Sequence, residues 1–116
     1  MERLVKKKCL PCLKTTPPLR EGELRALHEE LGGSWRLIEG KQLEKSYPFK
    51  NFKEALAFVN GIGEEAEREA HHPDLTLSWG KVVVKLWTHA IQGLSENDFI
   101  LAAKIDALYI SKTGHY

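Results

Sequence analysis

Residues 71–89 read HHPDLTLSWGKVVVKLWTH, and the pattern inside this stretch decides the fold expected for the chain. Apolar and polar residues alternate over 75–79, which predicts a strand with one buried face. Gly80 and Lys81 mark a turn, and a second strand is expected over 82–88. The two strands therefore form a β-hairpin.

The hairpin should gather histidines at one edge of the sheet. Its turn lies nearly midway between His72 and His89, so pairing of the strands places both residues at the same edge. His71 precedes His72 directly, and the chain has only five histidines in total. Because histidine normally exchanges a proton near neutral pH, three clustered histidines can move protons or hold a metal.

Two helices and another pair of strands are expected before this hairpin. A leucine stripe ended by two glycines predicts a helix, and an alternating pattern around Glu39-Gly40 predicts another hairpin. Asn51, followed by Glu54 three residues later, is typical of a helix N-terminus, and Pro73 requires that helix to end near Ala70. These elements are a helix over 20–31, strands over 35–37 and 43–49, and a helix over 51–70.

A last helix is expected over 95–109, with Ser95 as its N-cap and Asp98 in its first turn. The predicted fold class is α+β, in the order α-β-β-α-β-β-α. We expect a two-layer sandwich in which three helices cover one face of a four-stranded, mostly antiparallel sheet.

Length and composition agree with one globular domain. The chain has 116 residues, of which 42% are hydrophobic, and its net charge is +1. That charge argues against a dedicated nucleic-acid-binding protein, and no apolar run is long enough to span a membrane. We expect an extended N-terminal arm over 1–18, rich in basic residues, and a single domain over 19–116.

Cys9 and Cys12 are the only cysteines, and they lie in the basic arm. Three interpretations are open: two reduced cysteines without a chemical function, a metal site or disulfide at a subunit contact, or a redox pair. The two-residue spacing is typical of the last two. Because two cysteines give no sign of a disulfide scaffold, we expect a cytoplasmic location.

The residues alone leave three interpretations of the histidine cluster open. A metal site is weakened because neighbouring histidines rarely present both rings to one ion, and only Glu67 and Asp98 could complete the shell. A structural role in the loops is the second interpretation. The third is general acid–base catalysis. Glu67 lies four residues before His71, a spacing that places both on one helical face, whereas Asp98 can simply cap its helix. Trp79 either packs on the sheet or stacks on a flat ligand.

The spacing of these residues resembles the signature of the pterin-4a-carbinolamine dehydratase family. Three residues separate Glu67 from His71-His72-Pro73, and five separate Pro73 from Trp79. Nine residues then separate Trp79 from His89, and eight separate His89 from Asp98. The resemblance covers about residues 18–110 and extends to four surrounding segments: Thr88-His89, Gly93-Leu94-Ser95, Gly33-Ser34-Trp35 and Phe49-Lys50-Asn51-Phe52.

The resemblance implies an enzyme, a hydro-lyase that dehydrates 4a-hydroxytetrahydropterin to the quinonoid dihydropterin in tetrahydrobiopterin recycling. It implies His71 and His89 as the acid–base pair and His72 as a residue that binds and orients the pterin. It implies that Glu67 holds a histidine or the pterin, and that Asp98 orients a histidine from behind by accepting from its second ring nitrogen. It also implies that backbone atoms of residues 71–73 and 88–91 line the pterin site; these residues are His71, His72, Pro73, Thr88, His89, Ala90 and Ile91. No cofactor and no metal are implied.

The resemblance also implies a homotetramer or homodimer and a functional link to an aromatic amino acid hydroxylase. The wide apolar stripe of the last helix, which includes Phe99, Ile105 and Tyr109, agrees with a subunit contact. Packing of that stripe under the N-terminal arm of the same chain is the alternative. A non-catalytic binding module or a transcriptional dimerisation cofactor is the alternative function.

Overall fold

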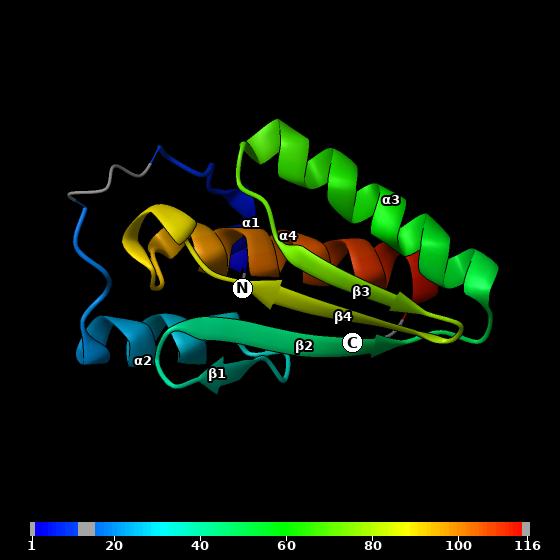
Figure 1. The fold of residues 1–116 in the computed structure, drawn as a ribbon, viewed down its shortest axis with the longest axis horizontal. Helices are drawn as coiled ribbons and strands as arrows, with labels where there is room; N and C mark the ends of the chain where they lie inside the picture. The colour runs from blue at the N-terminus through cyan, green and yellow to red at the C-terminus, as the bar shows by residue number, and fades with distance from the viewer. Residues whose placement is uncertain (1, 12–15, 115–116) are drawn as a thin grey trace.

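The structure is a computed structural model that describes residues 2–11 and 16–114. Four strands form one open sheet, and helices pack beside it (Figure 1). The helices are α1 (Glu2–Lys6), α2 (Glu21–Leu31), α3 (Phe52–Glu69) and α4 (Glu96–Thr113), with a 3₁₀ helix η1 (His89–Ile91). The strands are β1 (Arg36–Ile38), β2 (Gln42–Pro48), β3 (Asp74–Ser78) and β4 (Lys81–Leu86). The predicted α+β class and the order of the main elements are confirmed.

The two predicted hairpins join through their inner strands into one sheet of order β1-β2-β4-β3. Every neighbouring pair is antiparallel, and Tyr47 of β2 lies opposite Val82 of β4. The apolar positions of the two inner strands point toward the helices and are fully buried; these residues are Leu43, Tyr47, Val82, Val84 and Leu86. The alternation read from the sequence therefore sets which face of the sheet is covered.

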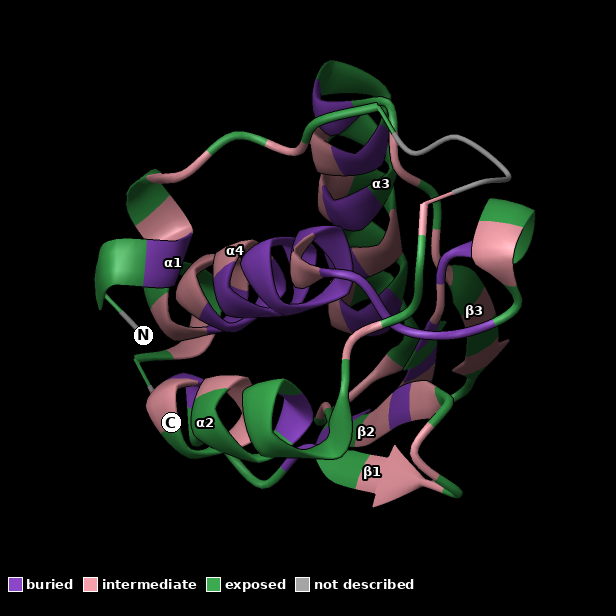
Figure 2. Cartoon of the chain, turned by 90° about the vertical axis from the view of Figure 1, so that its left-hand side faces the viewer, coloured by how far each residue is buried: buried purple, intermediate pink, exposed green. Residues whose placement is uncertain are grey.

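Helix α4 occupies the centre of the molecule and is largely buried (Figure 2). Its neighbours include α2, α3 and α1. A Cβ placed at Gly61 of α3 would lie 2.9 Å from a methyl carbon of Leu108 on α4, so glycine at this position allows the two helices to approach closely. This contact explains a glycine that would otherwise weaken the interior of α3.

The N-terminus differs from the expected extended arm. Residues Glu2–Lys6 form the short helix α1, which raises the number of α-helices to four and packs against α4. Leu4 of α1 is fully buried in the same core as Phe99 and Ile105. Because α1 covers part of the wide apolar stripe of α4, that stripe is buried within one chain and gives no sign of a subunit contact. A five-residue helix cannot be recognised from local pattern alone, since its stability comes from this packing.

Among the described residues, no helix combines the length and the apolar character needed to cross a membrane.

Candidate active site

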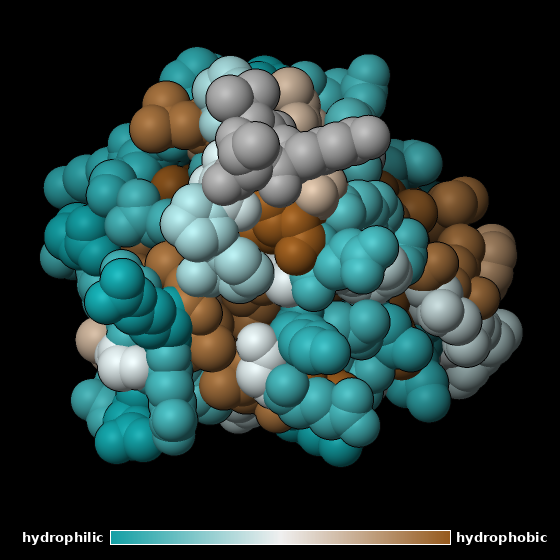
Figure 3. Space-filling model, turned by 60° about the vertical axis from the view of Figure 1, so that its left-hand side comes forward, coloured by the Kyte–Doolittle hydropathy of each residue, from teal (hydrophilic) through white to brown (hydrophobic). Residues whose placement is uncertain are grey.

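The end of the β3–β4 hairpin that carries the histidines borders an open cavity of about 540 Å³. The arrow of β4 ends beside the start of β3, close to η1 and to the last turn of α3 (Figure 1). Figure 3 turns the left-hand side of Figure 1 toward the viewer, and patches of hydrophobic surface are visible there between hydrophilic side chains. The residues that line the cavity are Lys8, Cys9, Leu10, Pro11, Arg68, Glu69, Ala70, His71, His72, Trp87, Thr88, His89, Ala90 and Asn97. Its volume is within the range of small-molecule sites.

His71 is held from behind by a buried carboxylate. Its Nε2 lies 2.7 Å from Oδ1 of Asp98, whose side chain is completely buried. An ionised carboxylate can only accept, so Nε2 donates and the neutral ring keeps Nδ1 as its free acceptor. The imidazole therefore has a defined tautomer and a defined orientation at the cavity.

Asp98 also caps α4, and both functions suggested by the sequence are present together. Its Oδ2 accepts hydrogen bonds from the backbone N–H of Ser95 at 3.0 Å and from the hydroxyl of Thr88 at 2.8 Å. Thr88 and Ser95 are themselves linked through their hydroxyl oxygens at 2.7 Å. Two donors thus hold Oδ2 of the carboxylate, and Oδ1 accepts from His71.

Glu67 pairs with His72 and not with His71. The distance from His72 Nε2 to Glu67 Oε2 is 2.5 Å, and both side chains are exposed. The spacing of four residues predicts a pair between Glu67 and His71 only while the helix continues. At Ala70 the backbone turns into the left-handed region, with φ 52° and ψ 38°, and His71 leaves the helical face. An exposed pair of this kind contributes little to stability.

His89 lies after the end of β4, which is shorter than predicted. The strand stops at Leu86, and His89 begins the 3₁₀ helix η1. This histidine is exposed, and its ring lies 4.4 Å, centroid to centroid, from the ring of Trp87, which also lines the cavity. The hairpin topology therefore brings His71, His72 and His89 to one cavity, as the sequence predicted.

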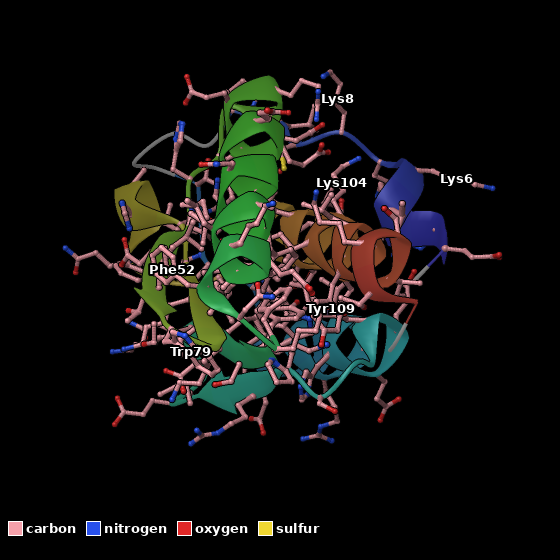
Figure 4. All side chains as sticks on the ribbon, turned by 90° about the vertical axis from the view of Figure 1, so that its right-hand side faces the viewer. Lys6, Lys8, Phe52, Trp79, Lys104 and Tyr109 are labelled. Atoms are coloured by element: carbon pink, nitrogen blue, oxygen red, sulfur yellow. The ribbon has the colours of Figure 1, made fainter. Side chains whose placement is uncertain are left out.

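Trp79 is not brought to this cavity within the chain. It lies in the turn at the opposite end of the hairpin and is 68% exposed (Figure 4). Thr88 and Ala90 line the cavity. Pro73 and Ile91 directly follow the lining residues His72 and Ala90 but do not line the cavity themselves. A single-chain stacking role for Trp79 has no support in this geometry.

The N-terminal segment lines the cavity, which sequence reasoning missed. Cys9 donates its backbone N–H to Glu69 Oε1 at 2.8 Å, and Leu10 donates to Asn97 Oδ1 at 2.9 Å. These contacts join residues 60 and 87 positions apart, so no local pattern in the sequence could have indicated them.

Cys9 has a strongly perturbed thiol. Burial, followed by the nearby charge of Glu69, raises its pKa to about 12. The thiolate is the reactive and metal-binding form, so the neutral thiol favours the interpretation of Cys9 without redox or metal chemistry. Cys12 lies outside the described residues. Within 2–11 and 16–114, no group of three or more histidine, cysteine, aspartate and glutamate residues is arranged to hold a metal ion.

Comparison with known proteins identifies one family. The family model described as "Pterin 4 alpha carbinolamine dehydratase" matches residues 17–108. A protein of Alkaliphilus metalliredigens named "Putative pterin-4-alpha-carbinolamine dehydratase" is 52% identical over 106 residues, which cover 91% of this chain and 96% of that protein. A protein of the same name from Rickettsia bellii is 51% identical over 102 residues, covering 88% of this chain and 90% of the relative.

Two solved structures share the fold. The crystal structure of a transcriptional coactivator/pterin dehydratase from Brucella melitensis superimposes with a TM-score of 0.73 at 32% identity, covering 78% of this chain and 97% of that one. A pterin dehydratase-like protein, described as a RuBisCO assembly factor in the alpha-carboxysome, gives a TM-score of 0.58 at 25% identity, covering 68% of this chain and 93% of that one.

Proposed function

The chain belongs to the pterin 4 alpha carbinolamine dehydratase family, and we propose on this basis that it is an active hydro-lyase that dehydrates 4a-hydroxytetrahydropterin to the quinonoid dihydropterin and water. The observation that carries the proposal is the His71–Asp98 pair, which presents an oriented imidazole at a cavity that His89 also lines. An imidazole of fixed tautomer and orientation supports a role in proton transfer.

The reaction requires two proton movements. The bond between C4a and the hydroxyl oxygen breaks, its electron pair leaves with the oxygen, and a proton converts the oxygen to water. A ring N–H loses its proton, and the electron pair of that bond forms the new C=N bond. One proton is taken up and one is released. The electron pair that leaves C4a with the oxygen is replaced by the pair from the N–H bond, so no oxidant or reductant is consumed.

His71 and His89 are the proposed acid–base pair. Nε2 of His71 is bound to Asp98, so Nδ1 is the atom that exchanges the proton. His72, which is exposed and paired with Glu67, is proposed to bind and orient the pterin, together with the backbone of residues 88–91.

The direct test is a dehydration assay with freshly generated 4a-hydroxytetrahydropterin, followed by ultraviolet absorbance. Release of the quinonoid dihydropterin faster than the uncatalysed reaction supports the enzyme. No acceleration by the folded protein would contradict it and would favour the alternative, a binding module or transcriptional cofactor on the same fold; the Brucella melitensis protein is described as a coactivator as well as a dehydratase.

We also propose that the chain acts in the cytoplasm as a homotetramer or homodimer, linked to an aromatic amino acid hydroxylase that produces its substrate. The surface that supports self-association is different from the α4 stripe expected from the sequence. Phe52 and Leu56 of α3 are 44% and 40% exposed, and Trp79 is also exposed. All three are large apolar side chains on the outside of the chain, and Figure 4 shows the positions of Phe52 and Trp79.

A further inference from the structure

We propose that residues 8–11, which lie outside the part of the chain matched by the family model, form a wall of the substrate cavity. In this wall Leu10 is an apolar contact for the pterin and Asn97 is the residue that positions it. The inference rests on the proposed function for the identity of the ligand. The family match begins at residue 17, so it assigns nothing to this segment.

The segment is anchored on the side of α1. Leu4 is fully buried, the carbonyl of Val5 accepts a hydrogen bond from Lys104 Nζ at 2.7 Å, and Lys7 pairs with Glu96 at 2.8 Å. Lys104 and Glu96 both belong to α4, the helix that also presents Asp98. Residues that follow α1 are therefore directed along the N-terminal end of α4, toward the cavity.

A second set of contacts fixes the segment at the cavity itself. Asn97 accepts from the Leu10 N–H and donates its own amide to the Leu10 carbonyl, so both backbone groups of Leu10 are bound by one side chain. Glu69, which is 8% exposed, accepts from the Cys9 N–H. Asn97 precedes Asp98, and Glu69 lies two residues before His71. The wall is thus bound to the two elements that hold the His71–Asp98 pair.

Leu10 combines a fixed backbone with an uncovered side chain. It is 70% exposed, the most exposed of the large apolar residues in the described part of the chain, and it lines the cavity. An apolar side chain held at a cavity in this way gains stability when a flat apolar ring covers it. Cys9 beside it adds a small, neutral thiol, so residues 9 and 10 offer a mainly apolar surface to one side of the ligand.

The first experiment compares the same substitution, leucine to alanine, at two positions. Leu10→Ala should raise KM and the dissociation constant of 7,8-dihydrobiopterin about tenfold, with kcat changed far less, because an apolar binding contact is lost while the proton-transfer groups remain. The matched control is Leu56→Ala on α3, which removes the same atoms from an exposed leucine outside the cavity and should leave KM unchanged at equal oligomeric mass. Because Leu10 is exposed, its variant should fold normally, which circular dichroism checks.

The positioning role of Asn97 has its own readout. Asn97→Ala should raise KM and also increase hydrogen exchange of the Leu10 amide, whereas Leu10→Ala should leave that exchange unchanged. The proposal that residues 8–11 line the pterin site would be contradicted by a wild-type KM in the Leu10→Ala variant. It would also be contradicted if hydrogen exchange of the Leu10 amide were unchanged in the Asn97→Ala variant.

Ligand protection separates this proposal from the proposed function. In a Cys12→Ser background, alkylation of Cys9 by iodoacetamide at pH 8.5 should slow at least fivefold when 7,8-dihydrobiopterin saturates the cavity. If 7,8-dihydrobiopterin protects Cys9 from alkylation but the protein does not dehydrate the substrate, residues 8–11 line the pterin site and the proposed enzymatic function is contradicted. If the protein dehydrates the substrate but the ligand does not protect Cys9, the enzymatic function is supported and the proposed role of residues 8–11 is contradicted. Absence of both pterin binding and turnover contradicts both.

Discussion

Replacement of Asp98 by asparagine tests how the carboxylate controls His71. In the native protein Oδ1 accepts from His71 at 2.7 Å, while Oδ2 accepts from Ser95 and Thr88. An amide has only one acceptor oxygen. If that oxygen keeps the Ser95 N–H, the NH₂ group faces Nε2 of His71 and forces the ring into the other tautomer, with its proton on Nδ1.

The expected magnitude follows from the loss of two effects. The charge-assisted hydrogen bond, worth about 1.5–3 kcal/mol in stability, is lost. The general acid–base function proposed for His71 requires the native tautomer, so its loss should lower kcat/KM about 10²–10⁴-fold. The fold should persist, because the amide oxygen that replaces the carboxylate in Asp98→Asn can still cap α4.

The assay measures kcat/KM per folded molecule, with urea unfolding on the same samples. Asp106→Asn is the matched control, because Asp106 is a second buried aspartate on the same helix, away from the cavity. It accepts from Trp35, Lys45 and Tyr47 at 2.6–3.0 Å, so its replacement should destabilise the protein and leave kcat/KM of the folded fraction unchanged. A folded Asp98→Asn variant with kcat/KM within threefold of the wild type would refute the orienting role.

Four further results are expected. His71→Ala and His89→Ala should each lose about 10²–10⁴-fold in rate with intact circular dichroism, and near-normal turnover in both would contradict their assignment. Turnover should survive exhaustive chelation with the metal content checked, whereas loss of activity that only zinc restores would favour the three-histidine metal site. Cys9 should alkylate about 10³-fold more slowly at pH 8 than a thiol of pKa 9.0, because at its pKa of about 12 far less thiolate is present; a rate typical of a free cysteine would contradict its burial. Light scattering at micromolar concentration should show a tetramer or dimer, and a mass near 13.2 kDa that is unchanged on concentration would rule out the oligomer.

Local pattern was sufficient where each residue acts through its near neighbours. The alternation in β3 and β4 predicted the hairpin and the gathering of the histidines at one edge. Asn51 accepts from the Glu54 N–H at 2.9 Å, as a helix N-terminus requires, and Ser95 with Asp98 forms the predicted capping box of α4. A capping hydrogen bond joins residues three positions apart, and the side chains of a strand alternate with a period of two. Both features depend only on residues close in the sequence, so the sequence predicts them.

Other features could not be read in this way because they depend on where the backbone turns. The left-handed residue Ala70 directs His71 to Asp98 and leaves Glu67 to His72, although the spacing favoured Glu67 and His71. Trp79 matches the family spacing, yet the length of β3 carries it to the far end of the hairpin.

The sequence by itself determined the order of the main elements, the N-terminal ends of α3 and α4, the family and the residues of the histidine cluster. Only the tertiary structure decided which carboxylate holds which histidine, that α1 covers α4, and that Cys9 and Leu10 border the cavity. Short-range preferences are properties of neighbouring residues, whereas contacts across 60 to 99 positions form only when burial of a common core, including Leu4, brings distant segments together.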